Sequence, residues 1–232
     1  MTHELTRLEH PWPAVLMHWA HLLSFFALIA TGLAIHAHAG WFGPLGTVRQ
    51  VHFVVMYIFI LTTVIRIYWA FFGAGSARLG GLARERDWHF FGLNGADVKS
   101  TPSWIAYYLF VRKTKPDVVK YGSLQKLTYA ILFPVGILVM ALSGFAMFAP
   151  TTGSMMWFTN VFGGLNGVRL MHYWTMWILI MFFMIHFYLV IVEEPAQAST
   201  MLFRTVPQSM RVPGDYTEPT SGAASGAAGQ KA

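Results

Sequence analysis

Two histidines lie inside one long apolar stretch in the last third of the sequence. The stretch from Val168 to Val192 contains no acidic residue, and its one arginine, Arg169, stands near its beginning. About 25 residues at 1.5 Å each are enough to cross a hydrocarbon core of roughly 30 Å. Ionisable groups are costly inside a bilayer, so His172 and His186 are expected to have a function there.

The spacing of these two histidines indicates what that function could be. At about 100° per residue, His186 returns to within about 40° of the direction of His172, and the two lie roughly 21 Å apart along the helix axis. Both imidazoles are therefore expected on one face of the helix. This arrangement suits two stacked cofactors, one near each membrane surface.

Four apolar segments are predicted to be membrane-spanning helices. Only 11% of the 232 residues are charged, compared with about 25% in soluble domains. Pro134 is expected to kink the third helix, and Glu193, Glu194 and Pro195 are expected to end the fourth. We therefore predict an all-α, four-helix membrane bundle formed by residues 1–206, followed by a disordered tail at 207–232. The predicted spans are residues 13–36, 51–72, 126–148 and 168–192.

The basic residues predict the orientation of the bundle. Most of the 16 lysines and arginines lie at the two ends of the chain and in the segment 73–126, whereas the loops on the other side hold Arg49 and Arg169. Positive residues stay in the cytoplasm, so both termini are predicted there. The segment Trp104–Lys115 is predicted to form a cytoplasmic interfacial helix between helices two and three. The alternative is an apolar patch that contacts a partner subunit.

The predicted topology places four histidines at two depths. His18 and His186 lie at matched depths on the cytoplasmic side, and His52 and His172 match on the outer side. Two facing imidazoles at each level are the ligand set of a bis-histidine haem. His21 shares much of the face of His18, so helical geometry alone leaves either one as the inner ligand.

Several neighbours of the histidines fit this interpretation. Gly32 falls on the face of His18 at the outer level, where the missing Cβ would let a porphyrin approach the backbone. Arg66 falls on the face of His52 at the inner level and could pair with a haem propionate, or it could extend to the cytoplasmic surface. Arg49 and Arg169, each one helical turn before an outer histidine, could pair with the outer propionates.

A weak internal repeat relates the first and second halves of the bundle. Thr31-Gly32 and Ser143-Gly144 close the first and third helices, and Arg49–His52 and Arg169–His172 open the second and fourth. Two parallel helix pairs would produce this pattern.

These motifs resemble those of the b-type cytochrome subunit of nickel–iron hydrogenases. The resemblance covers about residues 8–206 and favours His18 over His21 as the inner ligand. The sequence differs from the family pattern at Val15, where arginine is usual, and at Tyr173, where a basic residue is usual. Cytochrome b subunits of formate dehydrogenases and of thiosulfate or polysulfide reductases share the architecture. The residues that carry the resemblance are His18-Trp19, Ser24, Leu28, Thr31-Gly32, Arg66–Phe71, Trp104–Lys115, Arg169–His172, Trp177, Phe182 and His186.

The resemblance implies an electron-transfer subunit in the bacterial inner membrane. It would anchor a periplasm-facing hydrogenase, made of a nickel–iron large subunit and an iron–sulfur small subunit, and the whole complex could form a homo-oligomer. Electrons would pass to an outer haem b (His52, His172), then to an inner haem b (His18, His186), and then to a quinone. The chain would not itself react with H2. It contains no cysteine, which excludes c-type haem attachment and cysteine-ligated iron–sulfur clusters in this subunit.

Three alternatives remain open at this stage. The chain could be the equivalent cytochrome b of a formate dehydrogenase or of a thiosulfate or polysulfide reductase. It could be a histidine-based metal transporter, although such a site would need ligands clustered at one depth. It could also be a structural anchor whose histidines pack without a cofactor.

Overall fold

The computed structural model describes residues 5–6, 12–73, 95–114, 116, 123–149, 151–192, 195–203 and 211–212. These residues are helical apart from one short antiparallel pairing of β1 (Leu5–Thr6) with β2 (Arg211–Val212). Four helices are long and apolar enough to cross a membrane, which confirms the predicted all-α class and number of spans. They are α1 (Trp12–His36), α2 (Leu45–Phe72), the continuous segment of η1 (Thr128–Leu132) and α6 (Phe133–Met147), and α8 (Gly164–Val192).

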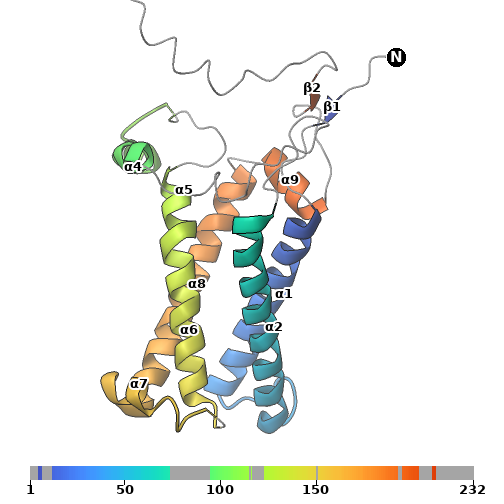
Figure 1. Ribbon diagram of the computed structural model, residues 1–232, viewed down its shortest axis with the longest axis vertical. Coiled ribbons are helices and arrows are strands. Elements are labelled where there is room, and N and C mark those ends of the chain that lie inside the picture. Colours follow the sequence, from blue (N-terminus) through green and yellow to red (C-terminus); the bar gives the residue numbers. More distant parts are fainter. Residues whose placement is uncertain are drawn as a thin grey trace, which may run out of the picture.

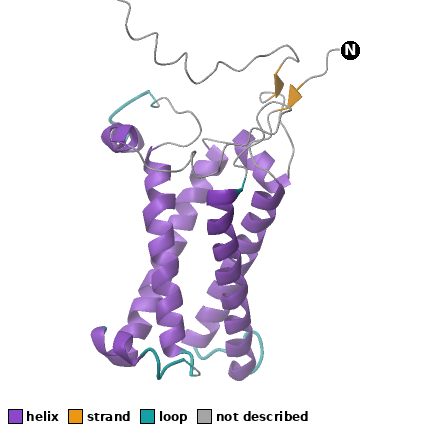
Figure 2. Cartoon of the chain, viewed as in Figure 1, coloured by secondary structure: helices purple, strands orange, loops and turns teal. Residues whose placement is uncertain are grey.

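The four long helices stand side by side, and shorter elements cover the two ends of the bundle (Figure 1). One end carries α9 (Pro195–Phe203), α5 (Ser123–Leu127) and α4 (Gly95–Tyr108), together with β1 and β2. The opposite end carries α7 (Met156–Val161) and the loop that joins α1 to α2 (Figure 2). We call these the α9 end and the α7 end. Arg211 and Val212 belong to the predicted C-terminal tail but are paired in β2, and the rest of that tail lies outside the described residues.

The bundle is built from two helix pairs, as the internal repeat predicts. The backbones of α1 and α2 pack closely together, and so do those of α6 and α8, whereas contact between the pairs is much sparser. Aromatic side chains bridge the pairs instead. Phe26 packs edge-on against Phe183 between α1 and α8, and the Phe53 ring lies 4.2 Å from that of Phe148 at the end of α6.

Two of the long helices begin earlier than predicted. Helix α2 begins at Leu45 rather than Val51, because Pro44 has a φ of −58° and its carbonyl accepts the amide of Val48, so the expected loop is already helical there. Helix α8 begins at Gly164 rather than Val168, after a turn in which Gly163 has a φ of 77°. His52 and His172 therefore lie about two turns inside their helices at the α7 end.

The predicted kink at Pro134 takes the form of a π-helical turn. Proline has no amide hydrogen, and its ring would clash with the carbonyl one turn earlier in a regular α-helix. The chain widens over η1, where the amide of Phe133 donates to the carbonyl of Thr128, five residues back. The helix crosses this point without breaking, as expected for a span whose backbone groups must be satisfied internally.

Small side chains dominate the buried positions, and large apolar side chains cover the outside. Ala34, Ser143 and Ala146 are fully buried, and a cluster of Ala146, Phe158 and Val168 seals the α7 end of the α6 and α8 pair. Many Phe, Ile, Leu and Trp side chains of the four long helices are exposed. A surface of this kind is suited to contact with lipid rather than water.

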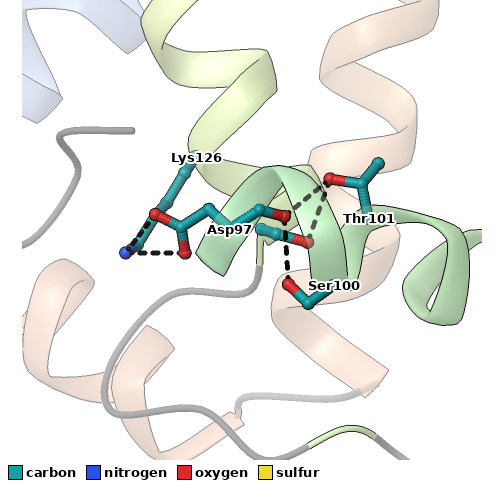
Figure 3. Close-up of polar contacts among 5 residues, drawn as sticks. Asp97, Ser100, Thr101 and Lys126 are labelled. Atoms are coloured by element: carbon teal, nitrogen blue, oxygen red, sulfur yellow. Dashed lines mark hydrogen bonds and ion pairs between the residues drawn. The ribbon is translucent and has the colours of Figure 1, made fainter. Parts of the chain in front are cut away.

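An ion pair connects α4 to α5, the short helix that directly precedes the third span. The ammonium group of Lys126 contacts both carboxylate oxygens of Asp97 at 3.1 Å, and both side chains are largely buried (Figure 3). The hydroxyls of Ser100 and Thr101 donate to the backbone carbonyl of Asp97, and the hydroxyl oxygen of Thr101 lies 3.4 Å from that of Ser123. The position of α4 thus depends on a polar contact at the α9 end.

Substitution of Lys126 by Met tests this attachment. We expect amide hydrogen exchange in residues 95–108 to become several-fold faster, because a partly exposed ion pair contributes about 1 kcal/mol. Exchange in α1 and α8 should not change. Lys99→Met, which removes an exposed lysine of α4, serves as the matched control. Equal exchange in the two variants would show that the ion pair does not hold α4 in place.

Candidate cofactor-binding sites

His52 and His172, near the α7 end, have similar polar environments. The Nδ1 atom of His52 lies 2.8 Å from the hydroxyl of Thr31, and the Nδ1 atom of His172 lies 2.8 Å from the hydroxyl of Ser143. Each hydroxyl also donates to the carbonyl four residues back in its own helix, at 2.6 Å for Thr31 and 2.5 Å for Ser143. A hydroxyl has one hydrogen to donate, and a carbonyl can only accept. The arrangement that satisfies both contacts has the hydroxyl donate to the carbonyl and the imidazole Nδ1–H donate to the hydroxyl oxygen.

This arrangement determines which ring nitrogen remains available. With the proton on Nδ1, the Nε2 atoms of His52 and His172 each keep a lone pair, which is the form in which imidazole binds a metal. The same hydrogen bond also orients each ring. Both histidines are therefore prepared to act as Nε2 ligands.

A glycine follows each hydroxyl residue and lies beside the same histidine ring. A Cβ atom on Gly32 would lie 3.5 Å from Cε1 of His52, and one on Gly144 would lie 3.7 Å from Cε1 of His172. Cε1 lies between the two ring nitrogens, so a side chain at either position would contact the imidazole, and glycine leaves that edge of the ring uncovered. Gly32 thus lies at the level at which the sequence predicts a porphyrin.

The structure places the four histidines in two couples, His52 with His172 and His18 with His186, as the sequence predicts. His52 and His172 lie close enough for a charge on one ring to act on the other, although α2 and α8 belong to different helix pairs. The same is true of His18 on α1 and His186 on α8, just under two turns from the α9 end. All four side chains are partly buried. The bundle therefore contains one histidine couple near each end.

His18 and His21 have different surroundings, which helical geometry alone could not reveal. The Nδ1 atom of His18 is buried and has no hydrogen-bond partner within the described part of the chain. By contrast, both nitrogens of His21 are engaged, Nδ1 with the carbonyl of Met17 and Nε2 with the hydroxyl of Thr63, each at 2.9 Å. His21 is therefore a structural link between α1 and α2, and His18 is the candidate ligand at this level.

The three arginines singled out in the sequence lie at both ends of the bundle. Arg66 is partly buried toward the α9 end, close enough to His21 for its charge to act on that ring. Arg49 and Arg169 are exposed at the α7 end, one turn before His52 and His172, and Arg169 donates to the side-chain oxygen of Asn166 at 3.0 Å. Positive charge thus accompanies each histidine couple at its own end.

Tyr173, one of the departures from the family pattern, contacts a histidine of another helix. Its ring stacks on His36 at the end of α1, with centroids 4.4 Å apart and planes at 21°. This contact adds to the bridges between the helix pairs at the α7 end. His36 itself is exposed.

The donor set fits haem better than a bare metal ion. Among the described residues, no group of three or more His, Cys, Asp or Glu side chains gathers at one place. A couple of imidazoles is the axial ligand set of a b-type haem, in which the porphyrin supplies the other ligands. The sequence did not predict that the hydroxyls of Thr31 and Ser143 contact His52 and His172. Both residues occur at equivalent positions of the internal repeat, which was the available signal.

The sequence is similar to those of known cytochrome b proteins. The family described as prokaryotic cytochrome b561 matches residues 9–204. A "Probable Ni/Fe-hydrogenase B-type cytochrome subunit" of Azotobacter vinelandii is 28% identical over 207 residues, covering 82% of each chain. Proteins with the same name from Azotobacter chroococcum mcd 1 and Rhodobacter capsulatus are 29% and 23% identical, over 82% of this chain in both cases and over 84% and 76% of their own lengths.

The contrast between His18 and His21 leads to a paired prediction. We expect His21→Leu to lower the thermal midpoint, because two hydrogen bonds of about 1 kcal/mol each are lost, and to leave the iron content of the purified chain unchanged. His18→Leu should lower the iron content. Thermal unfolding in detergent and iron analysis measure both effects. A greater loss of iron from the His21 variant would show that the ligand at this level has been misidentified.

Proposed function

The chain belongs to the prokaryotic cytochrome b561 family, and from that premise we propose that it is the di-haem membrane subunit of a hydrogenase. It accepts electrons from a periplasm-facing nickel–iron hydrogenase at the α7 end and passes them across the bilayer to a quinone at the α9 end. Membership of a cytochrome b family implies b-type haem, and the relatives are named as hydrogenase cytochrome subunits. The haem iron, when bound, supplies reversible one-electron storage.

The observation that carries this proposal is the matched pair of histidine environments at the α7 end. His52 and His172 come from different helix pairs, and each has Nδ1 bonded to a hydroxyl and Nε2 left available. A transporter site or a purely structural contact gives no reason for two neighbouring imidazoles to leave the same nitrogen available. An outer haem held between them accounts for it.

A second histidine couple would hold the inner haem. His18 and His186 lie near the α9 end, and the ring of Phe182 is nearly parallel to that of His186, with centroids 6.2 Å apart. Arg66 is the candidate partner for an inner propionate, since a guanidinium forms strong charged hydrogen bonds to carboxylates. Arg49 and Arg169 are the corresponding candidates at the outer level, and Gly32 keeps the porphyrin approach clear.

The partner subunits are inferred from what the chain lacks and from the names of its relatives. Without cysteine, this subunit cannot hold a cysteine-ligated iron–sulfur cluster. Its electrons must therefore come from another protein, and the relatives' names favour the iron–sulfur small subunit of a nickel–iron hydrogenase and its large subunit. A formate dehydrogenase or a thiosulfate or polysulfide reductase is the alternative partner. Co-purification with the catalytic subunits distinguishes these cases.

The α9 end is the proposed cytoplasmic side of a bacterial inner membrane. Helix α4 is seen end-on beside the upright bundle, so its axis runs across the long helices (Figure 1). Leu109, Phe110 and Val111 are exposed just after it, and the exposed basic residues Arg112 and Lys113 follow. Apolar residues next to basic ones suit the boundary between lipid tails and anionic headgroups. We assign α4 to that boundary.

A haem count is the direct test of the proposed function. We expect a pyridine haemochrome assay on the purified chain to give about two haem b per polypeptide, and about one for His172→Ala or for His186→Ala, because a bis-histidine haem needs both ligands. His38→Ala removes an exposed histidine at the α7 end and should retain the full complement. A haem-free wild-type chain would contradict the proposal.

Single cysteines can report the orientation, because the chain has none of its own. We expect Ser154→Cys, an exposed position beside α7, to react with a membrane-impermeant maleimide in intact spheroplasts. Lys99→Cys, an exposed position on α4, should react only after lysis. The reverse labelling pattern would place the two ends on the opposite sides.

A further inference from the structure

We propose that the hydroxyls of Thr31 and Ser143 are positioning groups that lower the reduction potential of the outer haem. Each one fixes the tautomer and the orientation of one axial histidine, His52 or His172, and strengthens that histidine as an electron donor to iron. This inference rests on the proposed function, because it needs a haem held by those two residues. It adds a specific role for two residues that would not themselves touch the iron.

The geometry is the same in both halves of the bundle. In each helix pair, the hydroxyl belongs to the helix that ends at the α7 end, and the imidazole belongs to the helix that begins there. Both Nδ1 to hydroxyl distances are 2.8 Å. Thr31 and Ser143 are also both buried, so water does not compete for these hydrogen bonds. Two independent copies of one arrangement are better explained by a shared role than by incidental packing.

The direction of the hydrogen bond determines its electronic effect. An imidazole that binds iron through Nε2 carries its proton on Nδ1, so it donates to the hydroxyl oxygen of Thr31 or Ser143. The hydroxyl hydrogens are then directed to the carbonyls of Ala27 and Val139. A histidine that donates from Nδ1 has more electron density at Nε2 and is a more basic ligand. A more basic axial ligand stabilises ferric over ferrous iron, which lowers the reduction potential.

Other histidines in the bundle show that this contact is not a general way to satisfy a buried imidazole. The Nδ1 atom of His18 has no partner within the described residues. His21 does contact a threonine hydroxyl, that of Thr63, but through Nε2, the nitrogen that a ligand would need for iron. His52 and His172 each pair Nδ1 with a hydroxyl and leave Nε2 available, and neither His18 nor His21 does so.

The test is a redox titration of the purified holoprotein, followed by visible absorbance and by the electron paramagnetic resonance of the low-spin ferric haems. The variants are Thr31→Val, Ser143→Ala and the double variant. We expect one of the two haem couples to shift to higher potential in each single variant and further in the double variant. The shift in the double variant should correspond to roughly a tenfold change in the reduction equilibrium, about 59 mV for a one-electron couple.

Conservative and matched variants complete the design. Thr31→Ser and Ser143→Thr keep a hydroxyl and should restore the wild-type potential and resonance. Thr63→Val removes a hydroxyl that contacts the Nε2 atom of His21 and should leave the outer couple unchanged. Loss of the outer haem in Thr31→Val that is restored in Thr31→Ser would also support the positioning role.

Different results would contradict the positioning role of the two hydroxyls and the proposed function of the chain. Two bound haems with unchanged potentials and resonances in the double variant would overturn the positioning role and leave the proposed function intact. Equal shifts in Thr31→Val and Thr31→Ser would also overturn it, because the hydroxyl would then not be the cause. A wild-type chain without haem would overturn both.

Discussion

The structure depends on the need to satisfy every polar group inside a hydrocarbon environment with partners from the protein or its cofactor. An imidazole has two nitrogens, so it needs two partners. His21 finds both in α1 and α2, and its role is complete within the protein. His52 and His172 each find one, a neighbouring hydroxyl, and retain the other nitrogen. The difference between a packing histidine and a candidate ligand is therefore a difference in how many nitrogens the protein itself engages.

The same requirement connects the two halves of the bundle. Backbone packing is tight within the α1 and α2 pair and within the α6 and α8 pair, and it is sparse between them. Aromatic rings bridge the pairs. Each histidine couple also spans the two pairs, since it combines one histidine of α8 with one from α1 or α2. A haem held by such a couple would link the halves directly. Haem binding would then stabilise the folded bundle, as any ligand does that binds only the folded state.

Local rules of chain geometry explain most of the departures from expectation. The loop before α2 contains glycine and proline, which suggests an irregular segment, yet a proline just before a helix favours helix initiation. The helix therefore begins at Leu45. Pro134 does not break its span, because the chain widens into a π turn just before it, where the amide of Phe133 donates to the carbonyl of Thr128. In both cases a residue that usually interrupts structure is accommodated by the backbone around it.

Much of this protein could be predicted from the sequence by itself. Apolar length determines the four spans, and the spacing of histidines along helices of known rise places His18, His52, His172 and His186 at two depths, since both depend only on local geometry. Only the tertiary structure distinguishes the surroundings of His18 from those of His21, because residues on one helical face differ only in what the neighbouring helices present to them. It also revealed the partners of Thr31 and Ser143. Those hydrogen bonds join residues on different helices, and their geometry depends on how the helices pack.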